Sequence, residues 1–163
     1  MSKLPTVAII GQANVGKSSL FNRLTRSRTA IVAREAGTTR DNVVGKVSYK
    51  RRNVDSAPSD DYSQFWLIDT AGLKTAEDEF EATIQDQIAD ASAAADVILV
   101  TVDSTVYPSD ADRQLAKKAL KSGKPVILIA NKADLKGSLS IDEFKRLGIK
   151  NIIKTSAEHS IGI

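Results

Sequence analysis

A loop of the form G-x-x-x-x-G-K-S stands near the start of the chain and has the residue types that bind phosphate groups. It runs from Gly11 to Ser18, directly after the apolar run Thr6–Ile10. Glycines let the backbone turn tightly, so that successive N–H groups point inward at phosphate oxygens, and a following helix adds its positive amino end. We expect Lys17 to bridge the β- and γ-phosphates and the Ser18 hydroxyl to bind Mg²⁺. The residues expected to line the phosphate site are Gly11, Asn14, Val15, Gly16, Lys17, Ser18 and Ser19.

The motif Asp-Thr-Ala-Gly follows a second apolar run, Phe65–Ile68, and can sense a γ-phosphate through a metal ion. Asp69 ends the predicted strand, where its carboxylate can hold Mg²⁺, usually through a water molecule. Gly72 can offer its N–H to the γ-phosphate because it has no side chain to obstruct the approach. The alternative for these four residues is a turn that ends the strand.

The segment Gly37-Thr-Thr-Arg-Asp41 lies between the first predicted helix and the next strand. A threonine here can bring its hydroxyl to Mg²⁺ and its N–H to the γ-phosphate only while GTP is bound, which is an order–disorder switch. We favour Thr39 over Thr38 for this role. The alternative is a polar loop without a ligand.

A third motif, Asn131-Lys-Ala-Asp134, follows the apolar run Val126–Ala130 and can read a purine base. The Asp134 carboxylate can accept from the N1–H and the exocyclic amine of guanine, a pair of donors that adenine lacks. We expect Asn131 to tie this loop to the phosphate loop, and the stem of Lys132 to lie along the base. The alternative is a polar loop that caps a helix.

The dipeptide Ser156-Ala157 follows the last predicted strand and can present the Ala157 N–H to guanine O6, although two residues alone are a weak signal. The phosphate loop by itself does not distinguish GTP from ATP. Together with the other two motifs, in this order along the chain, it indicates a guanine-nucleotide-binding protein. A P-loop ATPase is the alternative, and it conflicts with Asp134 because adenine would leave that carboxylate unpaired.

The elements that must hold these motifs follow from the alternation of apolar runs and amphipathic segments, which is typical of a mostly parallel sheet. Predicted strands are Thr6–Ile10, Val43–Tyr49, Phe65–Ile68, Asp96–Asp103, Pro125–Ala130 and Asn151–Lys154, and predicted helices are Lys17–Thr25, Glu79–Ala94, Asp110–Ser122 and Ile141–Leu147. We expect an α/β fold, a three-layer P-loop NTPase of the Ras-like G-domain type. Its six-stranded sheet has one antiparallel edge strand, next to Phe65–Ile68, and helices cover both faces.

Composition sets outer limits on what the chain can be. Its 163 residues suffice for one domain, and with no cysteine and a single histidine, His159, it has neither disulfides nor a zinc site. No apolar run approaches the ~20 residues that cross a bilayer, and we expect a cytoplasmic protein. The net charge of +3 does not by itself predict nucleic-acid binding. We expect residues 1–163 to form a single GTP-binding G domain, a fragment of a longer protein that lacks its last helix.

The motifs and their surroundings resemble the translation-factor-related small GTPases, and within them the Era/MnmE/Der group. The likeness is strongest to the first, N-terminal G domain of the Der (EngA) family, and it covers most of the chain. Three features carry it: a strand that begins almost at Met1, the stretch Asn14–Leu24 with Ala30-Ile-Val32 beyond it, and Ser156-Ala-Glu-His159. Gly37–Asp41 also looks like MnmE, a tRNA-modification GTPase whose G domain lies inside a helical domain.

The resemblance implies a molecular switch that hydrolyses GTP to GDP and phosphate and acts in large ribosomal subunit assembly. It implies GTP or GDP and Mg²⁺ as ligands, and the ribosomal subunit or its rRNA as a partner. Der proteins carry two G domains and a KH-like domain, so other domains of a longer chain are implied partners too. An MnmE-like tRNA-modification GTPase and an Era-like rRNA-binding GTPase are the alternatives.

The Ras-like scheme has a glutamine directly after the Asp-x-x-Gly motif to orient the attacking water, and here Leu73 stands at that position. The resembled group replaces this function with a K⁺ ion held partly by a phosphate-loop asparagine, which corresponds to Asn14. The hypothesis is K⁺-stimulated hydrolysis through Asn14 and an ordered Arg34–Asp41 loop. Alternatively, Asn14 only stabilises its loop, and Arg34 and Arg40 either act as arginine fingers or are solvated charges.

A different class of function is a nucleotide-gated module that binds RNA or the ribosome and hydrolyses GTP only incidentally. Basic residues that could form an RNA-binding rim precede the third predicted strand, but acidic residues follow them closely in the sequence. These residues are Lys46, Lys50, Arg51, Arg52, Asp55, Asp60 and Asp61. Because positive and negative charges are mixed, the segment is typical of a solvent-exposed face.

Overall fold

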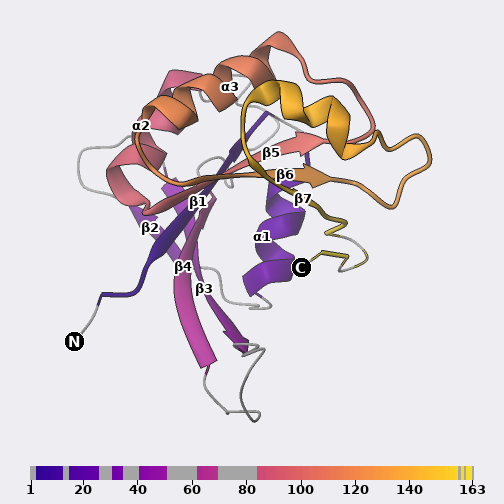
Figure 1. Ribbon diagram of the computed structural model, residues 1–163. Helices are drawn as coiled ribbons and strands as arrows, with labels where there is room; N and C mark the ends of the chain where they lie inside the picture. The colour runs from indigo at the N-terminus through magenta and orange to yellow at the C-terminus, as the bar shows by residue number, and fades with distance from the viewer. Residues whose placement is uncertain are drawn as a thin grey trace, which may run out of the picture.

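The structure is a computed structural model that describes residues 3–12, 15–25, 31–34, 41–50, 62–69, 84–157, 159, 161 and 162. Its centre is a seven-stranded sheet in the order β2-β3-β4-β1-β5-β6-β7 (Figure 1). None of the helices in these ranges is long and apolar enough to pass through a bilayer. The strands are β1 (Thr6–Gly11), β2 (Ile31–Arg34), β3 (Asp41–Lys50), β4 (Tyr62–Asp69), β5 (Val97–Asp103), β6 (Val126–Asn131) and β7 (Asn151–Lys154).

The sheet is parallel except at β3, which runs against both β4 and β2. The predicted fold class is therefore confirmed, with one addition. The short strand β2 (Ile31–Arg34) lies beyond β3, so the sheet has seven strands and the reversed strand is the second one in from the edge. Four residues are too few to give a periodic pattern, so β2 gives no clear signal in the sequence.

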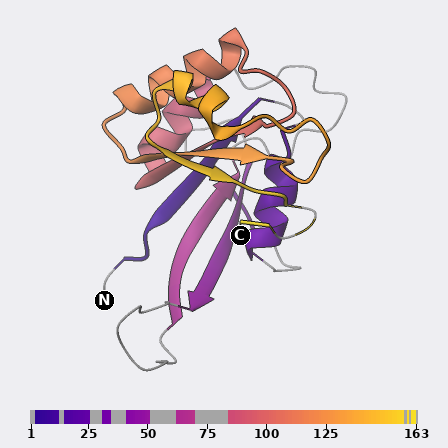
Figure 2. The same ribbon diagram turned by 45° about the vertical axis from the view of Figure 1, so that its right-hand side comes forward.

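Helices cover both faces of the sheet (Figures 1 and 2). They are α1 (Lys17–Thr25), α2 (Ile84–Ala94), α3 (Asp110–Lys121) and the 3₁₀ helix η1 (Ile141–Leu147). Alternate residues of β1 face opposite layers: Ala8 and Ile10 pack with α2, α3 and η1, whereas Ile9 packs with α1. This alternation follows from the two-residue period of a strand and gives the three predicted layers.

The segment Ile141–Leu147, predicted as an ordinary helix, is a 3₁₀ helix. Its buried residues Phe144 and Leu147 are three apart, which is the spacing that a 3₁₀ helix places on one face. Gly148 ends it with a left-handed φ of 81°. The element has only seven residues, so packing rather than propensity decides its type.

The first turn of α3 is closed by a capping box. The Ser109 Oγ accepts from the Asp112 N–H at 3.2 Å, and the Asp112 Oδ2 accepts from the Ser109 N–H at 3.0 Å. The N-cap of α3 is Ser109, whose backbone is extended, with φ at −83° and ψ at 171°. Asp112 is 5% exposed, so α3 begins at a buried carboxylate that is fixed from both sides of the turn.

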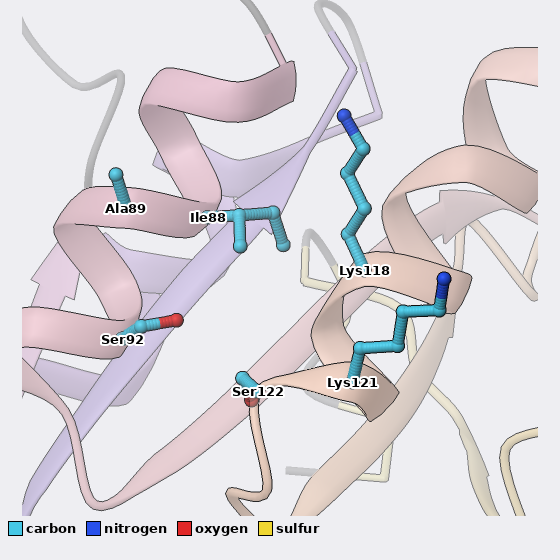
Figure 3. Close-up of a pocket in the computed structure, with 6 residues that line it drawn as sticks. All are labelled: Ile88, Ala89, Ser92, Lys118, Lys121 and Ser122. Carbon is cyan, nitrogen blue, oxygen red and sulfur yellow. The ribbon is translucent and has the colours of Figure 1, made fainter.

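A hollow of about 310 Å³ lies between α2 and α3 (Figure 3). Apolar and small side chains of α2 line one side of it, and the carboxyl end of α3 lines the other. It is lined by Ile88, Ala89, Ser92, Lys118, Lys121 and Ser122. None of the three sequence motifs contributes a residue to this hollow, so it is not the candidate functional site.

Replacing Gly45 by alanine is expected to destabilise the fold. Gly45 lies on β3 beneath α1, and a Cβ there would lie 2.5 Å from Thr25 Cγ2 and 2.9 Å from Phe21 Cζ. Overpacking of this kind costs about 1–3 kcal/mol, which urea unfolding would show as a lower midpoint. Ser48→Ala is the control at an exposed position of the same strand: it removes only an exposed hydrogen bond from the Gln64 side chain and should lower the midpoint far less. Equal midpoints for both variants would contradict this packing of α1 on β3.

Candidate functional site

The described residues of the three motifs meet at one edge of the sheet, where the parallel strands β1, β4, β5 and β6 end. The register aligns Ile9 of β1 with Asp69 of β4, and Asp103 of β5 with Asn131 of β6. In open α/β sheets this edge is where ligands bind. Strand pairing therefore brings together segments that are more than a hundred residues apart in the chain.

The phosphate loop joins β1 to α1 and needs both of its glycines. At Gly16, φ is 95°, and a Cβ would collide with the Nδ2 of Asn131. At Gly11, a Cβ would lie 2.6 Å from the Thr101 carbonyl oxygen. The Lys17 ammonium is buried and donates to the Gly11 carbonyl oxygen, so the loop closes on itself. Of the other loop residues, Val15 is buried and Ser19 is exposed, whereas Asn14 lies outside the described residues.

Two of the predicted magnesium ligands lie side by side. The Oγ of Ser18, at the start of α1, is 3.4 Å from the Oδ2 of Asp69, at the end of β4. Hydroxyl and carboxylate oxygens are ligands that Mg²⁺ prefers, and a carboxylate can hold the ion directly or through a water molecule. The pair therefore fits the ion. Thr39 and Gly72 lie outside the described residues.

Asn131 joins the base-reading motif to the phosphate loop. Its side chain is 2% exposed, and its Nδ2 donates to the Val15 carbonyl oxygen at 3.0 Å. Its Oδ1 accepts from the Thr155 hydroxyl at 3.0 Å and from the Ala157 N–H at 3.3 Å. One buried carboxamide thus fixes three segments: the phosphate loop, the end of β6 and the turn after β7.

Lys132 is held in an unusual backbone conformation, with φ at 62°, and its ammonium is 3.1 Å from the Asp103 carboxylate. Burial on its own would raise the pKa of Asp103, but hydrogen bonds from Thr105 and the nearby Lys132 ammonium outweigh it and hold that pKa below its ordinary value. The carboxylate is therefore ionised at neutral pH. It fixes the head of Lys132 so that the stem can lie flat against a ring.

Asp134 stands where the guanine-reading carboxylate is predicted, with its side chain 15% exposed. A hydrogen bond from the Ser156 side chain, and then the nearby His159 ring, lower the pKa of Asp134, while burial opposes them. The His159 Nε2 is 3.2 Å from the Asp134 Oδ2. The carboxylate is thus ionised and ready to accept from two donors. The Ala157 N–H, predicted for guanine O6, donates to Asn131 here through a long bond.

Four side chains that hold this site together are not singled out in the sequence: Gln12, Arg23, Asp103 and Thr155. The Arg23 Nε, on α1, donates to the Ala157 carbonyl oxygen at 2.7 Å. The sequence did contain a signal for Asp103, because this carboxylate ends an apolar strand, as Asp69 does. The other three have no local signal, since each acts on a segment far away in the chain.

The family model described as "50S ribosome-binding GTPase" matches residues 6–132, which contain the phosphate loop, Asp69 and the first half of the base-reading motif. The chain belongs to the 50S ribosome-binding GTPase family. Its relatives include the GTPase Der of Gemmatimonas aurantiaca, which is 40% identical over 98% of this chain and 34% of its own length. The chain therefore spans about a third of that relative.

Solved structures of other G domains have the same fold as this chain. The G domain of the T. maritima FeoB iron transporter superimposes with a TM-score of 0.69 at 26% identity, covering 98% of this chain and 92% of that one. Era in complex with MgGDPNP and nucleotides 1506–1542 of 16S ribosomal RNA superimposes with a TM-score of 0.66 at 28% identity, covering 98% of this chain and 53% of that one.

Proposed function

We propose that this chain binds guanine nucleotides and hydrolyses GTP to GDP and phosphate as a molecular switch. The observation that carries the proposal is that the described residues of the three motifs converge at one sheet edge, with Asp69 representing the second motif. The Ser18 Oγ lies 3.4 Å from the Asp69 Oδ2. The Asn131 carboxamide lies 3.0 Å from the phosphate-loop carbonyl of Val15. Membership of a GTPase family supports the same activity.

In this proposal Lys17 leaves the Gly11 carbonyl oxygen and holds the β- and γ-phosphate oxygens, while the loop N–H groups surround them. Ser18 and Asp69 would hold Mg²⁺ through their side-chain oxygens, and the Thr39 hydroxyl would join them in the GTP state. The ion, when bound, neutralises charge that develops on the phosphates. Gly72 offers its N–H to the γ-phosphate. The loss of that phosphate on hydrolysis releases Thr39 and Gly72, which is the switch.

Guanine is read by the side chains at the ends of β6 and β7. The Asp134 carboxylate accepts from the N1–H and the exocyclic amine, and the stem of Lys132 covers one face of the ring. Ser156 orients Asp134 by its hydrogen bond, and the Ala157 N–H turns from Asn131 to guanine O6. Adenine would leave the Asp134 carboxylate unpaired, so ATP is rejected.

Water attack on the γ-phosphate needs a stabilising group, because Leu73 cannot hydrogen-bond water. We assign this role to a K⁺ ion held partly by Asn14. When bound, such a cation would supply positive charge that offsets transition-state charge, as an arginine finger does.

The proposed setting is cytoplasmic assembly of the large ribosomal subunit, with that subunit or its rRNA as the partner. The description of the matched family and the likeness to GTPase Der support it. Because Der of Gemmatimonas aurantiaca is about three times as long as this chain, we also propose that the chain is one G domain of a multidomain protein. An MnmE-like or Era-like role would use the same nucleotide chemistry.

Phosphate release from GTP in the presence of Mg²⁺ tests the activity. We expect turnover of GTP but not of ATP, and faster turnover in KCl than in NaCl at equal ionic strength. Lys17→Ala should lower turnover by about a hundredfold or more, since a charged phosphate ligand is lost. The exposed lysine variant Lys121→Ala is the control and should retain full turnover.

Each arm of this experiment can fail separately. Equal rates in KCl and NaCl would remove the K⁺ proposal and leave the GTPase proposal standing. ATP turnover that matches GTP turnover would overturn the assignment of Asp134. Full turnover by the Lys17 variant would show that the activity does not come from this site.

A further inference from the structure

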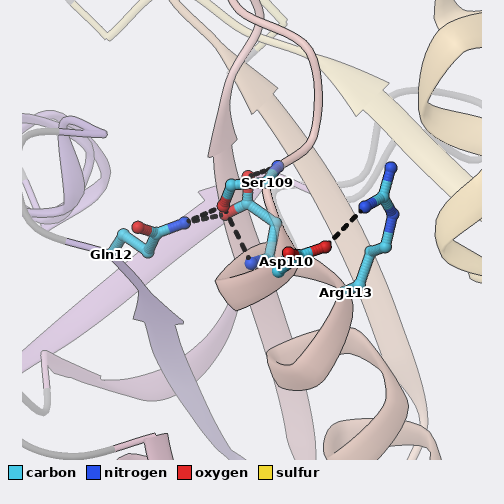
Figure 4. A network of polar contacts seen from close by, with 5 residues as sticks. Gln12, Ser109, Asp110 and Arg113 are labelled. Atoms are coloured by element: carbon cyan, nitrogen blue, oxygen red, sulfur yellow. Dashed lines mark hydrogen bonds and ion pairs between the residues drawn. The ribbon is translucent and has the colours of Figure 1, made fainter.

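Gln12 makes a contact that links the phosphate loop to α3. It is the first residue after β1, and its side-chain Nε2 lies 2.6 Å from the Ser109 Oγ and 2.7 Å from the Asp112 Oδ1 (Figure 4). The partners are about a hundred residues away in the chain. The contact therefore exists only because β1 and β5 pair and bring the loop beside the amino end of α3.

The receiving side of this contact is rigid. Ser109 and Asp112 already form the capping box of α3, in which the Asp112 Oδ2 accepts from the Ser109 N–H. The other carboxylate oxygen, Oδ1, accepts from Gln12. A carboxylate that is 5% exposed needs hydrogen-bond donors, and bonds to a charged acceptor are stronger than neutral ones. The capping box itself is fixed to the core, because Leu115 and Ala116 of the same helix are buried.

Hydrogen bonds thus fix the phosphate loop at two points, one on each side of its central residues. At its start the Gln12 carboxamide binds α3, and near its end the Val15 carbonyl oxygen accepts from Asn131. A hollow of about 240 Å³ lies beside the loop. Gln12 of the phosphate loop, Ser109 and Asp112 at the amino end of α3, and Lys132 of the base-reading motif all line it. The amino end of α3 therefore borders both segments. A loop that is fixed at two points before the ligand arrives loses less entropy on binding.

We propose that Gln12 is a positioning residue, whose side chain clamps the entry of the phosphate loop to the capping box of α3 and so slows the release of guanine nucleotide. This inference rests on the proposed function. It assigns no contact between Gln12 and the nucleotide. The carboxamide acts through the backbone of the loop that it fixes.

The test measures the dissociation rate of mant-GDP from the chain with Mg²⁺ present. Gln12→Ala should release mant-GDP roughly tenfold faster, the order expected when a hydrogen bond to a charged group is lost. Gln12→Glu should be worse, because it places a carboxylate against Asp112. In the double variant Gln12→Glu/Asp112→Asn the roles are exchanged, so that the amide at position 112 donates to the carboxylate at position 12. Its mant-GDP dissociation rate should therefore return to about twice the original rate or less.

The control is Arg113→Ala. It removes the exposed ion pair with Asp110, at 2.8 Å on the same turn of α3, and leaves the Gln12 contact untouched. Its mant-GDP rate should not change. Because the swap rescue restores a specific pair, it also separates clamping from a general loss of folding.

Two results would overturn the inference. One is a Gln12→Ala rate equal to that of the unsubstituted chain. The other is a double variant that is folded but as fast as Gln12→Glu alone. Failure of the unsubstituted chain to bind mant-GDP would overturn the proposed function as well, so the two failures are distinguishable.

Discussion

Asp134→Asn is expected to change the base preference of the chain from guanine to xanthine. The carboxylate offers two acceptors, which match the N1–H and the exocyclic amine of guanine. An asparagine offers one acceptor and one donor, and xanthine, which has a carbonyl where guanine has its amine, matches that pair. Sites that pair every donor of a ligand reject analogues strongly, so GDP affinity should fall by roughly 10³-fold or more while XDP affinity rises.

The surroundings of Asp134 make this change interpretable. Its pKa is lowered by the hydrogen bond from Ser156 and by His159, so the wild-type side chain is an acceptor only. Competition of GDP and XDP against mant-labelled nucleotide, followed by fluorescence, measures the change. Asp142→Asn is a matched control, because that carboxylate is 76% exposed on η1 and pairs only with Lys145 at 2.7 Å among the described ion pairs. A variant at Asp134 that keeps its preference for GDP would refute the base-reading assignment.

Asn131→Ala is expected to have the second-largest effect, on both binding and stability. The substitution leaves three buried groups without a partner in this cluster: the Val15 carbonyl oxygen, the Thr155 hydroxyl and the Ala157 N–H. At about 1 kcal/mol for each hydrogen bond, the free energy of unfolding should fall by about 3 kcal/mol. Nucleotide affinity should fall by about a hundredfold or more, because the phosphate loop and the base-reading loop lose their common support.

Urea unfolding and mant-GDP titration together check this prediction. Asn151→Ala, at an exposed position at the start of β7, is the matched control and should change neither quantity. At one fixed GDP concentration, the unfolding midpoint should rise much more for the control than for Asn131→Ala, because the stabilisation grows with the ratio of ligand concentration to Kd. Normal affinity in a destabilised Asn131 variant would contradict the role of this side chain in joining the two loops.

Much of the fold could be predicted because its signals are local. Buried strands such as β1, β5 and β6 are continuous apolar runs, and each is followed by a polar residue that ends it. The Ser109 cap at the start of α3 and Gly123, two residues after its end with φ at 78°, are also local features. The type of η1 and the existence of β2 could not be predicted, because short elements depend on what they pack or pair with.

The sequence by itself determined the candidate chemistry: a lysine-bearing glycine loop, a strand-ending carboxylate at Asp69 and the carboxylate proposed to read guanine, Asp134, are each contained in a few consecutive residues. Only the tertiary structure decided how they are held. The Gln12–Asp112, Lys132–Asp103 and Asn131–Val15 contacts join residues 29 to 116 positions apart. These partners meet because β1 lies between β4 and β5, with β6 next to β5. That order is a property of the whole sheet, so no local pattern encodes it.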